Sequence, residues 1–336
     1  MSLKFVFFTL TAFLWTTAAF ADDGFSHIRR RQYVACGINT EYKQLAYRRD
    51  NIWKGFDADI CRAVAAAVLG DAERIKLIPV KKSAVGRALN SGKIDIMLGH
   101  ASLTAADEVS QYVTPVDTLY LDRQIFASRR DTDARSMRDF TGNRVCVLKD
   151  SAAAAFLEEY NQKYALGFNI LPQSSQAQAK EAFYLNRCEL ISGDEIFINS
   201  IVSDLKSNNP AVVLPEEVAY IPVKAYAAGN NATLNIALRW IINALKVADN
   251  AGITSQNINI FNATKSRSLQ NLLGIREEAW MKLSLKPDWV RQYLPVYGNY
   301  HQILERNFGA DSPLQLDMTP NELVGRGGFL SFQPFI

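Results

Sequence analysis

The chain has 336 residues, of which 48% are hydrophobic and 21% are charged, and its formal net charge is +3. This composition is that of an ordinary globular protein, and the length is enough for about two domains. A net charge this close to zero, without a basic run interleaved with aromatic residues, argues against a nucleic-acid-binding protein.

The first 21 residues predict a secretory signal peptide. They combine Lys4, an apolar stretch from Phe5 to Trp15, and the small-x-small site Ala19-Phe20-Ala21, after which we expect cleavage. The apolar stretch is too short to span a bilayer comfortably, and no later segment approaches about 18 apolar residues. We therefore expect an exported, soluble mature protein.

A first α/β unit follows. "RQYVACGIN" (31–39) and "RIKLIPVKK" (74–82) predict strands, and the stretch 84–98, "AVGRALNSGKIDIML", predicts a helix and a third strand. Between the first two strands, "GFDADICRAVAAAVLGDAERI" (55–75) predicts a helix that Asp57 caps and Gly70 ends. Strands that alternate with helices are typical of a parallel α/β sheet.

The loop "GHASLTAADE" (99–108) comes directly after the third strand. Ligands of open α/β sheets bind at the C-terminal ends of the strands, so this loop is a candidate ligand site. It offers Ser102 and Thr104 as hydroxyl donors, and then Asp107 where an anion-binding loop would need a cation.

The pattern restarts after a strand-like segment, "LDRQIFASRR" (121–130), and a polar, turn-rich stretch. "RVCVLKD" (144–150), "FNILPQ" (168–173) and "CELISGD" (188–194) predict strands, and the segments between them predict helices. Residues 220–253 predict a returning strand and a long amphipathic helix, whose periodicity does not say which half it joins. After residue 263 we expect one short helix, "NYHQILERNFG" (299–309). Two α/β halves joined by an extended segment predict two lobes with a cleft between them.

The chain contains four cysteines: Cys36, Cys61, Cys146 and Cys188. An even number in an exported chain predicts disulfides. Cys36 ends the first strand and Cys61 lies on the buried face of the following helix, while the other two lie in strands that we expect to be neighbours. Pairing within each half is therefore expected, with four buried free thiols as the alternative. Without a Cys-x-x-Cys pair or clustered histidines, we expect no zinc site and no other cofactor.

Seven stretches of the sequence resemble the general L-amino-acid-binding proteins of polar amino acid ABC importers. They are "VACGIN", "GFDADICRAVAAAVLGDAERI", "LNSGKIDIML", "RVCVL", "NRCELISGD", "LRWIINALKVADNAGITSQNI" and "GNYHQILERNFGADSPL". The resemblance covers nearly the whole mature chain. It implies an α/β fold of the type II periplasmic binding protein class, in which two α/β lobes joined by a hinge of two crossing strands close on a ligand.

The resemblance also implies a domain organisation and a function. We expect a signal peptide at 1–21, lobe 1 at 22–125 and 224–262, lobe 2 at 126–223, and a C-terminal extension at 263–336 packed on the lobes. The expected protein is a periplasmic monomer and not an enzyme. It captures a small polar ligand, an amino acid or a related amine, for an ABC permease in the inner membrane.

In the first lobe, the resemblance implies that Tyr42 or Leu45 covers the ligand and that Ser102 and Thr104 bind its carboxylate. Three residues beyond that threonine the family has an arginine that clamps the carboxylate, and here the position is Asp107. Loss of a bidentate cation, and its replacement by a carboxylate, predict weak binding of a free amino acid.

In the second lobe, a family loop that binds the carboxylate corresponds to Asp150-Ser151-Ala152, with a helix N-terminus behind it that can donate N–H groups. A family aspartate that holds the ligand's ammonium corresponds to Asp194. Together with Asp107, these acids favour a cationic ligand such as a diamine.

Each of these residues also has a purely structural interpretation. Asp107 can cap the next turn, Asp194 can cap the following helix, Ser102 and Ser151 can be ordinary loop hydroxyls, and Tyr42 can be a packing residue. Two other functions stay open: a dehydratase-like enzyme on the same fold, for which no Ser-His-Asp or Cys-His arrangement is evident, and a diverged sensor or interaction protein that has lost its ligand.

Overall fold

The computed structural model describes residues 24–129, 136–204, 211–312 and 314–335, so the predicted signal peptide lies outside the described residues. One mixed β-sheet of eight strands runs through the molecule in the order β4-β1-β5-β10-β6-β9-β7-β8. The strands are β1 (Val34–Ile38), β4 (Ile75–Pro79), β5 (Ile96–Met97), β6 (Val113–Arg129), β7 (Arg144–Leu148), β8 (Asn169–Gln173), β9 (Leu190–Asp194) and β10 (Ala211–Ala228).

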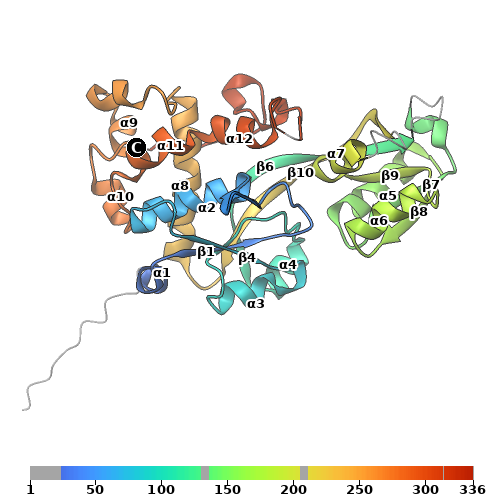
Figure 1. The fold of residues 1–336 in the computed structure, drawn as a ribbon, viewed down its shortest axis with the longest axis horizontal. Coiled ribbons are helices and arrows are strands. Elements are labelled where there is room, and N and C mark those ends of the chain that lie inside the picture. Colours follow the sequence, from blue (N-terminus) through green and yellow to red (C-terminus); the bar gives the residue numbers. More distant parts are fainter. Residues whose placement is uncertain (1–23, 130–135, 205–210, 313, 336) are drawn as a thin grey trace, which may run out of the picture.

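The sheet divides into two parallel parts joined by two long antiparallel strands. Strands β1, β4 and β5 form the part that we call lobe 1, and β7, β8 and β9 form the part that we call lobe 2. Strands β6 and β10 pair with each other along almost their whole length and run side by side from one lobe to the other (Figure 1). Both are longer than the sequence predicted, because the expected strands, 121–130 and the one that starts at residue 220, begin about halfway along β6 and β10. This is the predicted arrangement of two α/β lobes and two crossing strands.

Helices cover both lobes. Lobe 2 carries three of them: α5 (Ala152–Tyr164), α6 (Gln176–Tyr184) and α7 (Glu195–Asp204). The others are α1 (Ser26–Arg31), α2 (Phe56–Leu69), α3 (Val85–Asn90), α4 (Ala105–Ser110), α8 (Ala232–Asn250), α9 (Arg267–Leu272), α10 (Glu278–Lys282), α11 (Trp289–Tyr297) and α12 (Tyr300–Phe308). A small antiparallel pair, β2 (Tyr47–Arg49) and β3 (Ile52–Lys54), precedes α2.

The long amphipathic helix α8 packs on lobe 1, against α2 and β6, and the C-terminal helices lie on the same side (Figure 1). The predicted helix 299–309 is present as α12, but α9, α10 and α11 were not predicted. Their packing depends on buried aromatic side chains, above all Trp280 and Trp289, whose rings meet edge to face at 5.5 Å. Aromatic residues in short helices produce no regular period that a sequence pattern would reveal.

Asp57 does not cap α2, contrary to the sequence-based prediction. The helix begins two residues earlier than predicted, at Phe56, and Gly55 occupies the cap position with φ of +108°. A Cβ on Gly55 would lie 2.3 Å from the carbonyl oxygen of Leu45, so only glycine fits there. Asp57 is instead buried in the first turn of the helix.

Both disulfides that the sequence predicted are present. Cys36 in β1 bonds to Cys61 in α2, and Cys146 in β7 bonds to Cys188 beside β9. Each bond lies within one lobe and joins elements of its core, so neither restricts the movement of one lobe relative to the other.

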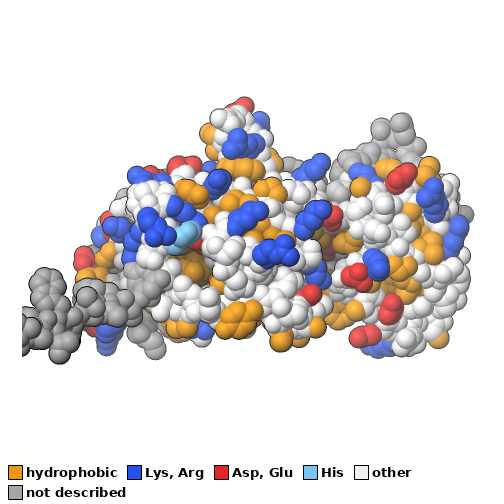
Figure 2. Space-filling view, turned by 90° about the horizontal axis from the view of Figure 1, so that it is seen from below, with side chains coloured by type: hydrophobic (Ala, Val, Ile, Leu, Met, Phe, Trp, Pro, Cys, Tyr) orange, Lys and Arg blue, Asp and Glu red, His pale blue; other side chains and the backbone are white. Residues whose placement is uncertain are grey.

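Within the described ranges, no helix combines the length and the hydrophobicity needed to cross a membrane. On the face shown in Figure 2, lysine and arginine side chains are dispersed among uncharged ones. Such a surface agrees with the balanced charge of the sequence.

Candidate functional site

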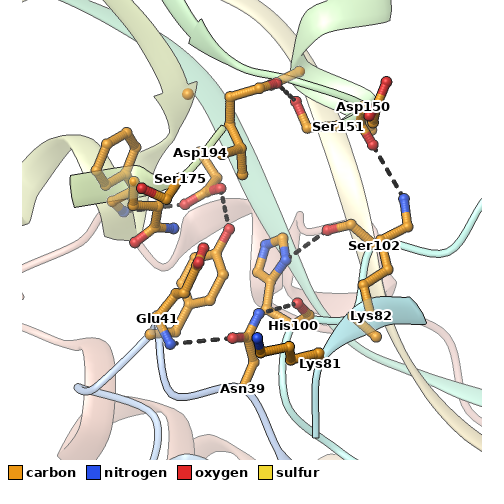
Figure 3. A pocket seen from close by; sticks show the side chains of 18 of the residues that line it. Asn39, Glu41, Lys81, Lys82, His100, Ser102, Asp150, Ser151, Ser175 and Asp194 are labelled. Carbon is orange, nitrogen blue, oxygen red and sulfur yellow. Dashed lines mark hydrogen bonds between the residues drawn. The ribbon is translucent and has the colours of Figure 1, made fainter. Parts of the chain in front are cut away.

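A cavity of about 820 Å³ opens between the two lobes, at the carboxyl ends of their parallel strands. Lobe 1 contributes the segments after β1, β4 and β5, and lobe 2 the segments after β7, β8 and β9. Its lining includes three lysines, Lys81, Lys82 and Lys149, and four acids, Glu41, Asp107, Asp150 and Asp194. Figure 3 shows Glu41, Lys81, Lys82, Asp150 and Asp194 around the cavity.

Tyr42 and Asp194 join the two lobes at the base of the cavity. The Tyr42 hydroxyl donates to Oδ2 of Asp194 at 2.6 Å, and Oδ1 of Asp194 accepts the backbone N–H of Phe197 at 3.0 Å. Asp194 therefore serves as a cap of α7, one of the interpretations left open by the sequence, and faces the cavity at the same time. The Tyr42 ring stacks on the ring of His100, with centroids 4.4 Å apart.

His100 is a buried member of the site that the sequence did not single out. Its Nδ1 lies 2.7 Å from Oγ of Ser102, and its Nε2 lies 3.3 Å from Oδ2 of Asp122 in the crossing strand β6. Burial lowers the pKa of His100, but its close contact with the Asp122 carboxylate and the charges of the nearby acids outweigh that effect, so the pKa is raised. Burial, together with the charge of Asp194, raises the pKa of Asp122 to about 7.

Asp57 lies behind this group. It is 1% exposed, and neither of its carboxylate oxygens has a hydrogen-bond partner. Burial raises its pKa to about 8. Asp57 is therefore protonated near neutral pH, so it adds no second carboxylate charge beside the His100–Asp122 pair.

His100, Asp122 and Asp194 are the described residues that come closest to a metal site, because each offers a ligand atom within 4.8 Å of the others. Their donor atoms are mostly engaged already. Both oxygens of Asp194 and Oδ1 of Asp122 accept hydrogen bonds from the protein, and the remaining atoms, His100 Nε2 and Asp122 Oδ2, face each other. The geometry fits a buried imidazole–carboxylate pair better than an open coordination shell.

Asp107 lines the cavity, but its charge is already paired. It is the third residue of the short helix α4 and forms a capping box with Thr104: Thr104 N–H donates to Asp107 Oδ2 at 3.0 Å, and Asp107 N–H donates to Thr104 Oγ1 at 3.1 Å. Thr104 Oγ1 also donates to Oδ2, at 2.9 Å. The ammonium of Lys82 lies 3.2 Å from the same oxygen. Burial raises the pKa of Asp107, but the bonds from Thr104 and the charge of Lys82 outweigh it and lower it. The predicted repulsion of a ligand carboxylate is therefore weakened by Lys82.

Ser151 caps the long helix α5 of lobe 2. Its Oγ accepts the N–H of Ala154 at 3.1 Å and donates to the carbonyl of Leu148 at 2.6 Å. Asp150 precedes it in the left-handed region, with φ of +56°, and its side chain is 82% exposed. The predicted acid at position 150 thus points largely to solvent, and this loop presents backbone groups to the cavity.

The cavity brings together most of the site residues predicted from the sequence: Tyr42, Ser102, Asp107, Asp150, Ser151 and Asp194. Thr104 is an exposed cap outside the cavity lining, and Leu45 is buried in the core. His100 was not predicted, although it lies in the candidate loop 99–108 itself. Asp122 gave no comparable signal, because its strand β6 also contains Asp117, Arg123 and Gln124.

Comparison with known proteins identifies relatives along almost the whole chain. The family model described as bacterial extracellular solute-binding proteins, family 3, matches residues 34–273. The general L-amino acid-binding periplasmic protein AapJ of Rhizobium johnstonii is 28% identical over 307 residues, which cover 90% of each chain. The glutamate/glutamine/aspartate/asparagine-binding protein BztA of Rhodobacter capsulatus is 25% identical over 310 residues and 92% of each chain.

Among solved structures, this chain is similar to an ABC transporter periplasmic binding protein from Brucella ovis with glutathione bound. The two superpose with a TM-score of 0.84 at 27% sequence identity, covering 94% of this chain and 100% of the other. The similarity includes the C-terminal helices as well as the two lobes.

Proposed function

The chain belongs to family 3 of the bacterial extracellular solute-binding proteins, and from this premise we propose that it captures a small ligand with amino-acid groups for uptake by an ABC permease. The ligand class is an amino acid or a short peptide of the size of glutathione. In this proposal the protein is periplasmic and monomeric, and it is not an enzyme. Its lobes have the boundaries expected from the sequence. The observation that carries the proposal is the cavity lined by charged and aromatic side chains from both lobes.

Asp194 is the residue that binds the ligand's ammonium group. It is the most buried of the four acids that line the cavity, at 7% exposed, and its Oδ2 accepts the Tyr42 hydroxyl from the opposite lobe. An ammonium group can share that oxygen or replace the hydroxyl, because an ionised carboxylate accepts about four hydrogen bonds.

Tyr42 and His100 form the wall of the ligand site. Their stacked rings provide a flat surface beside Asp194 that excludes water from the base of the cavity. The backbone N–H groups at the start of α5, beyond Ser151, donate to a carboxylate from the side of lobe 2.

Ligand capture closes the two lobes. Among the described strands, only β6 and β10 join the lobes through the sheet, and both disulfides lie within a lobe. A ligand that contacts Tyr42 from lobe 1 and Asp194 from lobe 2 favours the closed arrangement by its differential affinity for it.

The test is thermal unfolding of the mature protein with the twenty amino acids, reduced glutathione and a set of diamines. A ligand at about 100 times its dissociation constant adds about 2.7 kcal/mol of stability, enough to move the unfolding midpoint by degrees. A shift with an amino acid or with glutathione supports the proposal. A protein that responds to none of these compounds contradicts it, and a response to diamines alone would revive the cationic-ligand hypothesis.

A further inference from the structure

We infer that Lys82, oriented by Asp107, binds a free carboxylate of the ligand, which restricts the ligand class to amino acids and peptides with an ionised carboxylate. The inference rests on the proposed function and deepens it. The cation that binds the carboxylate is then Lys82, in the segment after β4. The sequence had instead pointed to the loop 99–108 as the ligand site.

Lys82 reaches across the mouth of the cavity. It begins a short 3₁₀ helix (Lys82–Ala84) after β4 in lobe 1, and its ammonium donates to the backbone carbonyl of Asp150 in lobe 2 at 3.1 Å. Figure 3 shows the side chain extended between the loop of Ser102 and the loop of Asp150 and Ser151. A carboxylate at this point would contact both lobes at once.

The ammonium group of Lys82 retains one donor for a ligand. Of its three N–H bonds, one is directed to Asp150 O and one to Asp107 Oδ2 at 3.2 Å. Asp107 Oδ2 is shared between Lys82 and Thr104, because the same oxygen also accepts two hydrogen bonds from Thr104. Asp107 therefore acts as a positioning residue that fixes Lys82, whose side chain is 33% exposed.

No other described cation in the cavity is anchored as Lys82 is. The lining contains no arginine among the described residues. Lys149 is 62% exposed and lies 3.9 Å from the outward-facing carboxylate of Asp150. Lys81 lies at the same lip but is exposed. A cation that the protein already holds in place loses less conformational freedom on binding an anion, so Lys82 should contribute most.

Comparing the affinity for a ligand with a free carboxylate to the affinity for its amide tests this inference directly. We would titrate the wild-type protein and Lys82→Met by calorimetry at low ionic strength with three matched pairs: leucine and leucinamide, arginine and argininamide, and reduced glutathione and its diamide. Each amide keeps the ammonium group and replaces every free carboxylate of the acid by an uncharged amide. Lys81→Met is the matched control, because it removes a neighbouring charge from the same lip of the cavity.

We expect the wild type to bind at least one acid about tenfold or more tightly than its amide, the low end for a hydrogen bond between charged groups. Lys82→Met should weaken that acid about tenfold and leave the amide within about threefold. Lys81→Met should keep the wild-type preference. Lys82→Arg retains the charge and should retain a preference for the acid, and it serves as the test variant if the methionine variant does not fold.

The outcomes separate this inference from the proposed function. If the wild type binds none of the six probes, the amino acid that shifts its unfolding midpoint replaces leucine, beside its amide. If neither an amino acid nor glutathione shifts the midpoint, the proposed function fails and the role of Lys82 fails with it. If acids bind wild type and Lys82→Met equally, or if amides bind the wild type as tightly as acids do, only the assignment of Lys82 is overturned. If Lys82→Met and Lys81→Met both lose the preference for the acid, the assignment of Lys82 is overturned as well. The preference would then come from the overall positive charge at this edge of the cavity.

Discussion

Replacing Tyr42 by Phe removes one hydroxyl group and keeps the ring that stacks on His100. That hydroxyl donates to Asp194 at 2.6 Å, and the two residues are only 4% and 7% exposed. A hydrogen bond to a charged group contributes about 1.5–3 kcal/mol, and a buried acceptor that loses its donor is not fully compensated by water. We therefore expect the Tyr42→Phe variant without ligand to lose about 2 kcal/mol of its free energy of unfolding.

The assay is urea-induced unfolding of ligand-free protein, followed by circular dichroism. Tyr47→Phe is the control, because Tyr47 is 39% exposed in β2 and its loss should change stability by less than about 0.5 kcal/mol. A ligand that binds Asp194 should stabilise Tyr42→Phe at least as much as the wild type, because its ammonium group supplies the missing donor. A variant as stable as the Tyr47→Phe control would refute the Tyr42–Asp194 contact between the lobes.

Three further predictions concern stability. Asp57, with its pKa raised by burial to about 8, holds a proton that the unfolded chain releases, so it makes stability fall by about 1.4 kcal/mol per pH unit as pH rises from about 4 to about 8. Asp57→Asn should therefore show a shallower decline than wild type in urea unfolding from pH 5 to pH 8, and identical slopes would count against a buried, protonated Asp57. Replacing Cys36 and Cys61 by alanine opens a link between residues 25 apart, which should cost about 3.5 kcal/mol in the chain-entropy model and lower the urea midpoint; an unchanged midpoint would contradict it. Asn321→Ala removes two hydrogen bonds, of 2.6 and 2.9 Å, between the C-terminal extension and strand β6. We expect the free energy of unfolding to fall by about 2 kcal/mol in the same assay. A change near zero would mean that the extension does not stabilise this strand.

The lobes and disulfides were predictable because they depend on local patterns. The alternation of apolar strands with helices, and the placement of cysteines in adjacent core elements, both follow from short stretches of sequence. The C-terminal helices α9 to α11 were not predictable in this way, since Trp280 and Trp289 become buried through contacts between short helices. Their burial is a tertiary effect that carries no period.

The sequence predicted residues that line the candidate cavity, but not how their charges pair. The loop 99–108 and Asp194 do meet at the cavity, because each follows the carboxyl end of a strand that is parallel to its neighbour in its own lobe, and the two lobes face each other across the cavity. The sequence suggested an acidic cleft at Asp107, since it could not show that Lys82, 25 positions earlier in number, folds back onto that carboxylate. Neither could it show that Asp57 loses its role as a helix cap and becomes buried beside His100.

The most direct test of the proposed function is calorimetric titration of wild type and Asp194→Asn with the twenty amino acids and reduced glutathione. Asparagine keeps the size of the side chain and its capacity to cap α7 but removes the charge that the ligand's ammonium would meet. We predict saturable binding of one ligand per wild-type chain and at least about tenfold weaker binding to Asp194→Asn. Absence of binding to the wild type, or equal affinity for both proteins, would contradict capture of an amino-acid ligand in this cavity.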